Sequence, residues 1–120
     1  MRDYSDIAYE ECEAILDALV GEDTETLEEK IDDEADIFVD SMGHLSKDDL
    51  ITAVAESNLS FFSHTIEAVD AEAGDDTFAA DCEGVMDASF GGGAPNEVKV
   101  RFRMEENEDG EITVSEMDIR

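Results

Sequence analysis

The apolar residues near the start of the chain recur at helical spacing. Over residues 4–20 they stand three or four positions apart, and Gly21 follows as a helix terminator. Asp23 or Thr24 can then cap a shorter helix, which we expect to end near Asp33. The pattern predicts two amphipathic helices in succession.

A short strand and a third helix follow. The strand covers Asp36–Asp40 and ends in a turn over residues 41–43. The helix begins after Ser46, whose side chain can cap it, and carries apolar residues as far as Leu59.

Beyond residue 60 the apolar residues alternate with polar ones, which is typical of strands. We predict four strands in this half of the chain, the first two joined by a turn at 74–76: they cover 64–71, 77–90, 98–104 and 112–119. The glycines at 91–93 are interpreted as a connection between strands, because a phosphate-binding loop would lead into a helix.

These elements predict one α+β domain over residues 1–120, in the order α-α-β-α-β-β-β-β. The sheet is expected to be curved and mostly antiparallel.

The charge of the chain adds an expectation about its environment. It has 35 Asp and Glu against 7 Lys and Arg, a net charge of -28, whereas a small domain usually carries a net charge of about 2–8 in magnitude. The Debye length falls from roughly 10 Å at about 0.1 M salt to roughly 3 Å near 1 M, so high salt screens the repulsion that opposes folding. The composition resembles that of proteins from salt-accumulating halophilic archaea; an acidic partner-binding protein of an ordinary cell is the alternative.

The same composition excludes some partners and sites. No basic patch is present to replace the counterions of a nucleic acid, and no apolar run approaches the roughly 18 residues that cross a membrane. The first residues lack the pattern of a secretory leader, so we expect a cytoplasmic protein. Cys12 and Cys82 stand far apart, and we expect buried thiols there and no disulfide. No metal or cofactor site is indicated.

The order of elements resembles the nuclear transport factor 2-like superfamily, which includes ketosteroid isomerases and polyketide cyclases. The likeness runs from the first helix and Gly21–Thr24 to the strands with Phe102–Met104 and Ile112–Ser115. It implies a cystatin-like fold in which the curved sheet wraps around the helices and leaves a conical cavity, often a small-molecule site. It also implies a homodimer formed through the outer face of the sheet.

In that superfamily the isomerases use an acid after the first strand as general base, and the matching residue here is Asp40. Their oxyanion hole is not matched, because Leu16 stands near the position of its Tyr and Arg101 lies in the strand that supplies its Asp. We therefore exclude steroid isomerisation. Asp40 has a simpler alternative role, in which it stabilises the turn that follows it.

Six further side chains are candidates for lining the cavity, two histidines and four apolar residues. They are His44, Phe61, Phe62, His64, Met86 and Phe102. A core or solvent-facing position is the simpler alternative for each of them. Arg101 and Arg103 alternate with the apolar face of their strand, so we expect them on the other side of the sheet, paired with acids of this chain or of a dimer partner.

Residues 105–116 nearly match a calcium-binding EF-hand loop, with Gly110 at its sixth position and Glu116 at its twelfth. The first position is Glu105 instead of Asp, and the flanking residues alternate as strands where an EF-hand requires helices. A hairpin turn is the better interpretation.

Two functions are consistent with this sequence. The first is a small enzyme or binding protein that holds an apolar molecule in the cavity, with Asp40 at its mouth and with isomerase- or cyclase-like proton transfer as its chemistry. The alternative is a non-catalytic dimerisation or interaction module that works through the exposed face of the sheet.

The net charge of -28 generates a prediction that is independent of function. We expect the midpoint of thermal unfolding to rise steadily from dilute buffer to molar KCl, because shorter screening lengths remove repulsion among the carboxylates. Circular dichroism across a KCl series measures this. Equal stability in dilute buffer and in molar KCl would show that the surface charge is not an adaptation to salt.

Overall fold

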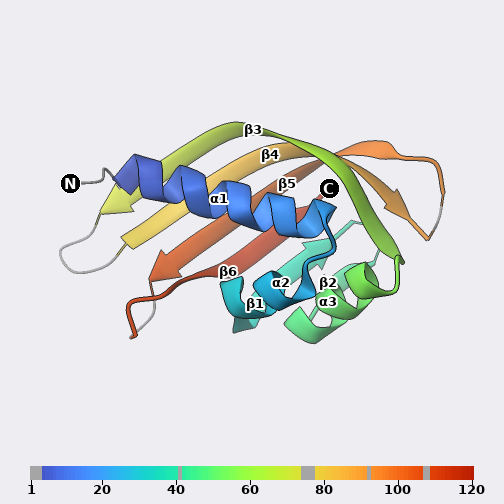
Figure 1. The fold of residues 1–120 in the computed structure, drawn as a ribbon, viewed down its shortest axis with the longest axis horizontal. Helices are drawn as coiled ribbons and strands as arrows, with labels where there is room; N and C mark the ends of the chain where they lie inside the picture. Colours follow the sequence, from blue (N-terminus) through green and yellow to red (C-terminus); the bar gives the residue numbers. More distant parts are fainter. Residues whose placement is uncertain (1–3, 41, 74–77, 92, 107–108) are drawn as a thin grey trace.

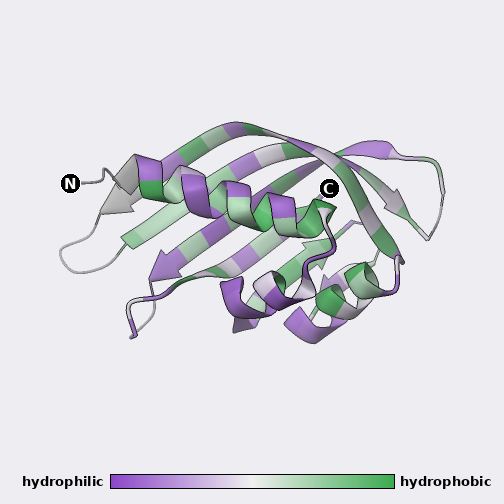
Figure 2. Cartoon of the chain, in the orientation of Figure 1, coloured by the Kyte–Doolittle hydropathy of each residue, from purple (hydrophilic) through white to green (hydrophobic). Residues whose placement is uncertain are grey.

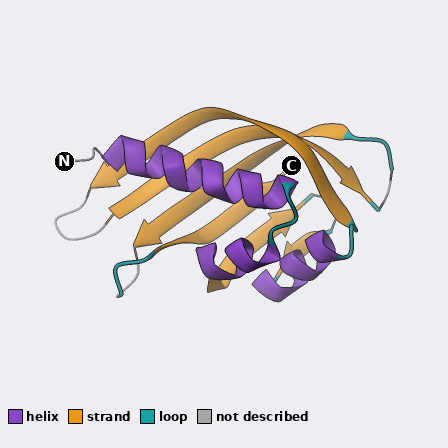
Figure 3. Ribbon diagram, viewed as in Figure 1, coloured by secondary structure: helices purple, strands orange, loops and turns teal. Residues whose placement is uncertain are grey.

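Three helices lie against one face of a six-stranded sheet (Figures 1 and 3). The structure is a computed structural model and describes residues 4–40, 42–73, 78–91, 93–106 and 109–120. The helices are α1 (Tyr4–Val20), α2 (Thr24–Lys30) and α3 (Lys47–Ala55). The strands are β1 (Ile31–Val39), β2 (Gly43–Leu45), β3 (Leu59–Ala73), β4 (Phe78–Phe90), β5 (Asn96–Glu106) and β6 (Ile112–Ile119).

The sheet has the order β2-β1-β6-β5-β4-β3, and all neighbours are antiparallel except β1 and β6. This confirms an α+β fold with a mostly antiparallel sheet, which is open and not closed into a barrel. In the part of the chain that the structure describes, no helix is long and apolar enough to cross a membrane.

The predicted elements differ from the structure mainly at their ends. The helix α2 ends at Lys30 and not near Asp33, because β1 begins at Ile31 and buries its side chain. Leu59 opens β3 and does not extend α3, which is followed by Ser57 in a left-handed conformation. The strand β2 was not predicted, since three residues are too few for an alternating pattern.

Some predicted connections fall on undescribed positions. The predicted turn at 74–76 lies outside the described residues, as do Ser41 of the predicted turn at 41–43, Gly92 of the predicted connection at 91–93, and residues 107–108.

The core lies between the helices and the sheet. Apolar and polar residues alternate along the strands (Figure 2), and the apolar ones of β4 and β5 are buried. The helix α1 packs chiefly on β3 and approaches β4 closely at Gly84. A Cβ atom at that position would lie 3.2 Å from Cδ1 of Leu16 and 3.1 Å from the carbonyl oxygen of Thr65, so glycine permits this approach.

The two cysteines form a disulfide between α1 and β4, so the expectation of free thiols was wrong. Cys12 and Cys82 are both buried, as expected, but their Cα atoms lie 6.4 Å apart with the sulfurs bonded. Cys12 is on the sheet-facing side of α1 and Cys82 on the helix-facing side of β4. The spacing of the cysteines along the chain does not reveal this proximity, which arises only when the helix packs on the sheet.

A nearly buried lysine joins the elements at the other end of the core. Lys47, at the start of α3, has a side chain only 7% exposed, and its Nζ lies 2.9 Å from Asp33 of β1 and 3.5 Å from Glu28 of α2. Burial opposes the charged form of Lys47, but its bond to Asp33 and the nearby Glu28 outweigh this and raise its pKa. One of the few cations of the chain is thus used to join three elements.

The disulfide generates a prediction about stability. It closes a loop across 70 residues of separation, and in the chain-entropy treatment such a link stabilises the folded state by roughly 4 kcal/mol. We expect the Cys12→Ala/Cys82→Ala variant to lose a free energy of unfolding of about this size, measured by denaturant unfolding in molar KCl.

Wild-type protein reduced under denaturing conditions and refolded in reductant is the matched control, because only the bond differs. A thiol assay on denatured, unreduced protein should detect no free thiol. Two free thiols per chain, or unchanged stability after reduction, would contradict the assignment.

Candidate functional site

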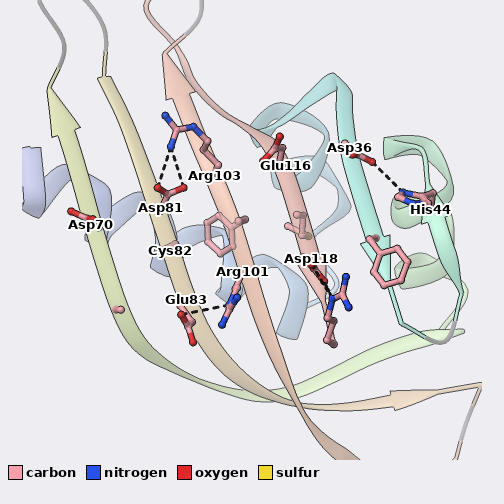
Figure 4. Close-up of a pocket in the computed structure, with 15 residues that line it drawn as sticks. Asp36, His44, Asp70, Asp81, Cys82, Glu83, Arg101, Arg103, Glu116 and Asp118 are labelled. Atoms are coloured by element: carbon pink, nitrogen blue, oxygen red, sulfur yellow. Dashed lines mark hydrogen bonds and ion pairs between the residues drawn. The ribbon is translucent and has the colours of Figure 1, made fainter.

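Charged side chains of the sheet gather on the face that the helices leave uncovered, here called the outer face (Figure 4). This face carries a hollow of about 740 Å³ that crosses all six strands. Its polar and aromatic lining consists of Asp36, Phe38, His44, Asp70, Asp81, Glu83, Arg101, Phe102, Arg103, Glu116, Asp118 and Arg120.

The strand β5 provides the positive charge of the outer face. Its alternation buries Val98, Val100 and Phe102 against the helices, so Lys99, Arg101 and Arg103 form a basic column on the opposite side. The expectation that Arg101 and Arg103 leave the apolar face and pair with acids of this chain is confirmed.

Carboxylates flank the basic column on both sides. The first row across the sheet pairs Arg103 with Asp81 of β4 and with Glu116 of β6, and it continues to Asp70 of β3 and Asp36 of β1. Nη1 of Arg103 donates to both carboxylate oxygens of Asp81, at 3.1 and 3.2 Å.

The second row pairs Arg101 with Glu83 of β4 and with Asp118 of β6. Glu83 accepts from Lys99 at 3.0 Å, while Nε of Arg101 lies 3.6 Å from the same carboxylate. Arg101 is held more loosely than Lys99, because its contact to Glu83 is longer and its side chain is 62% exposed against 46% for Lys99.

Beyond Asp118 of β6, the second row continues to Arg120 and the aromatic side chains of Phe38 and His44. Arg120 donates from Nε to Asp118 at 2.8 and 3.0 Å, and its guanidinium lies 4.8 Å from the centre of the Phe38 ring. His44 packs edge-on against the same ring at 5.1 Å, and its Nδ1 lies 3.3 Å from Asp36.

These pairs shift the titration of the outer face. The hydrogen bond from Lys99 lowers the pKa of Glu83 below its usual value of 4.5, and the charge of Arg101 adds to the effect. The bond to Asp81 raises the pKa of Arg103 further. Glu83 and Arg103 therefore both remain charged across the neutral range.

Two carboxylates of the hollow have no partner of this kind. Within the described ranges, Glu116 and Asp70 accept no hydrogen bond and form no ion pair. Glu116 stands beside the basic column, on the side away from the acid that binds Arg103.

Among the predicted cavity residues, His44 and Phe102 line the hollow, whereas the others do not. Phe61, Met86 and Phe102 are packed in the core, where each is at most 4% exposed. Phe62 is 56% exposed, and Asp40 lies at the end of β1 with its side chain in solvent. The backbone amide of Asp40 donates to the carbonyl of Ile119 at 2.9 Å.

The two predicted histidines lie on opposite faces of the sheet. His44 belongs to the outer face, whereas His64 of β3 contacts Asp17 of α1, with Nε2 2.5 Å from a carboxylate oxygen. The carboxylate of Asp17 accepts and does not donate, so Nε2 of His64 carries the proton. Nδ1 of His64 is buried and has no partner in the described part of the chain.

Residues 105–116, which nearly match an EF-hand loop, span the connection between β5 and β6, as their alternating flanks indicated. Strands β5 and β6 stand on either side of it, where an EF-hand requires helices. Residues 107–108 of this segment lie outside the described residues.

Sequence reasoning found the basic column of the outer face but missed its acidic neighbours. The alternation of β4 and β6 does place Asp81, Glu83, Glu116 and Asp118 on the polar face of each strand. Which strands are neighbours, and in which register, is set by tertiary structure and is not visible in the pattern.

The fold is similar to those of several solved proteins. A nuclear transport factor 2-like protein from Cytophaga hutchinsonii superposes with a TM-score of 0.81 at 15% identity, covering 98% of both chains. A ketosteroid isomerase-like protein from Erwinia carotovora atroseptica gives 0.73 at 12% identity, covering 99% of this chain and 96% of the other. A putative Ca/calmodulin-dependent kinase II association domain from Exiguobacterium sibiricum gives 0.66 at 8% identity, covering 86% and 81%.

These likenesses define the class of fold, an α+β domain like those of nuclear transport factor 2-like and ketosteroid isomerase-like proteins. At such identities they show the fold alone, since one fold hosts many functions. No protein-family model matches the sequence, and a comparison with curated proteins gives no match.

The ion pairs of the outer face generate a prediction about pH. Because the folded-state pKa of Glu83 is lowered, its stabilising effect is present above about pH 4.5 and is lost as the pH falls through the lowered value. We expect an NMR titration of the Glu83 side chain to give a midpoint below 4.5.

The variant Lys99→Met should raise that midpoint, because it removes the main hydrogen bond to Glu83. Lys30→Met is the control, since Lys30 bonds Glu11 of α1 on the other side of the sheet and should leave the midpoint unchanged. A Glu83 midpoint at 4.5 or above in the wild-type protein would contradict the pairing.

Proposed function

We propose that the protein is a non-catalytic interaction module that forms a homodimer through the outer face of its sheet. The observation that carries this proposal is the mixed charge of that face, where a basic column stands between two acidic ones. A face of this kind is complementary to a second copy of itself.

The distribution of the scarce cations supports this proposal. Of the 7 Lys and Arg, four lie on the outer face: Lys99, Arg101, Arg103 and Arg120. Lys30 and Lys47 are engaged at the helices, and Arg2 lies outside the described residues. The outer face is thus where two strongly acidic chains meet with the least repulsion.

Salt screens the long-range repulsion between two chains more strongly than it screens ion pairs in direct contact. Near 1 M salt the Debye length is roughly 3 Å, so repulsion between whole chains is largely screened, while charges pressed together within an interface are screened much less. A dimer of this design therefore forms most readily at high salt.

Other features favour interaction over catalysis. Of the residues predicted to line a cavity, Phe61, Met86 and Phe102 are packed into the core, and the acid matched to the isomerase base, Asp40, is exposed to solvent. One structural neighbour with this fold is described as a putative Ca/calmodulin-dependent kinase II association domain. That likeness supports the proposal only as an analogy.

The proposal predicts a dimer in solution that depends on the basic column. Sedimentation equilibrium in 2 M KCl should give a dimer mass for the wild-type protein, and Arg101→Gln should raise the dimer dissociation constant by about tenfold. Arg101 is chosen because its loose contact to Glu83 makes it the cation least needed for folding.

The matched control is Thr52→Glu, which also lowers the net charge by one but lies on an exposed position of α3, away from the outer face. It should leave the dissociation constant unchanged. A monomeric wild-type protein at about 100 μM, or equal weakening by both variants, would rule out the proposal.

The volume of the hollow favours a second candidate function, the binding of a small molecule. At about 740 Å³ it is within the range of ligand pockets. A ligand at a hundred times its dissociation constant stabilises the fold by about 2.7 kcal/mol. A thermal shift with apolar acids, sterols or polyketides, altered by Asp40→Asn or by Arg103→Gln, would favour this candidate and tell a site near Asp40 from one in the hollow.

A further inference from the structure

The charge pattern of the outer face also specifies how two copies would meet. We infer that the two-fold axis of the dimer runs parallel to the strands, midway between β5 and β6, so that Arg103 of each copy faces Glu116 of the other. This inference rests on the proposed dimer and adds to it the position of the axis and the residues that determine specificity.

The geometry follows from the symmetry of two facing sheets. Consider a two-fold axis that is parallel to the strands and lies between the two sheets. A strand on one side of this axis then faces the strand of the second copy that is equally far from the axis on the other side within its own chain, and positions along the strands are unchanged. With the axis midway between β5 and β6, the basic column of one copy lies opposite the acids of β6 of the other. Each charge pair then occurs twice, as an isologous interface requires.

The register gives the individual pairs. Arg103 and Glu116 are cross-strand partners, and so are Arg101 and Asp118. Rotation about the axis therefore places Arg103 opposite Glu116 of the second copy and Arg101 opposite Asp118 of the second copy. Twisted sheets that pack face to face cross at about 30°, so these rows stay opposite each other only near the axis. The strands β5 and β6 are adjacent to it.

An axis between β4 and β5 would be the other way to place opposite charges together. Both acids of β4 are already neutralised, because Asp81 binds Arg103 and Glu83 binds Lys99. Of the two acids of β6, Asp118 is bound by Arg120, so the difference between the two axes lies in Glu116. Glu116 of β6 lies beside the basic column, 31% of the Arg103 side chain is exposed, and Glu116 has no partner within the described ranges. Glu116 is the carboxylate that gains a partner from a second copy.

A charge-swap experiment tests this placement. Arg103→Glu and Glu116→Arg each place like charges opposite one another twice per dimer, and each should raise the dimer dissociation constant at least about tenfold. Mixing the two variants makes both contacts attractive again, so a heterodimer should form with an affinity near that of the wild type. An N-terminal fluorescent label on Glu116→Arg allows its titration with unlabelled Arg103→Glu by sedimentation in 2 M KCl.

The mixture is decisive because no pairing within one chain can explain a heterodimer. Circular dichroism first establishes that each variant is folded, since Arg103→Glu also faces Asp81 of its own chain. If that variant does not fold, Arg101→Glu mixed with Asp118→Arg tests the same axis at the second row. Glu29→Arg, on an exposed position of α2, is the control and should not pair preferentially with Arg103→Glu.

The possible failures can be told apart. A monomeric wild-type protein overturns the proposed function together with this inference. A wild-type dimer whose affinity is unchanged by either variant, or variants that weaken it and are not rescued by mixing, overturns the β5/β6 axis and leaves the dimer itself standing.

Discussion

The structure depends on one electrostatic constraint: 35 carboxylates share 7 Lys and Arg side chains. A cation can neutralise carboxylates that the fold brings close together. Elsewhere, repulsion between carboxylates is reduced only by their separation and by salt. Lys47 is used inside the fold, where it joins α2, β1 and α3, and Lys30 ties α2 to α1. Most of the others lie on β5 and beside it, at the centre of the sheet.

This placement divides the sheet into two faces with different roles. On the helix side, apolar packing, the glycine contact with Leu16 and the Cys12–Cys82 disulfide hold α1 to the sheet. On the outer side, alternating columns of charge on β4, β5 and β6 satisfy one another only in part and leave Glu116 without a partner in the described region. The fold thus buries its apolar side with its own helices and leaves a self-complementary polar side.

The sequence predicted the three helices and the long strands because their periodicity reflects which side of each element is buried. It placed Arg101 and Arg103 on the polar face by the same alternation, and it missed β2 because three residues carry no period. The disulfide and the rows of charge could not be predicted, since they depend on which elements become neighbours and in which register. Choosing Asp40 and the cavity residues relied on a family resemblance. The structure places His44 and Phe102 at the hollow and leaves the other side chains dispersed between core and solvent.

The most direct test of the central claim is small-angle X-ray scattering of the wild-type protein in 2 M KCl. One chain measures 45 × 26 × 21 Å, and the shortest of these axes runs through the layers of helix and sheet (Figure 1). Two copies joined by their outer faces stack along this short axis to a thickness of about 50 Å, because facing sheets lie about 10 Å apart. We therefore predict twice the 13.2 kDa mass of one chain with a longest dimension well below twice 45 Å. The mass of a single chain, or a dimer whose length approaches twice 45 Å, would contradict the account.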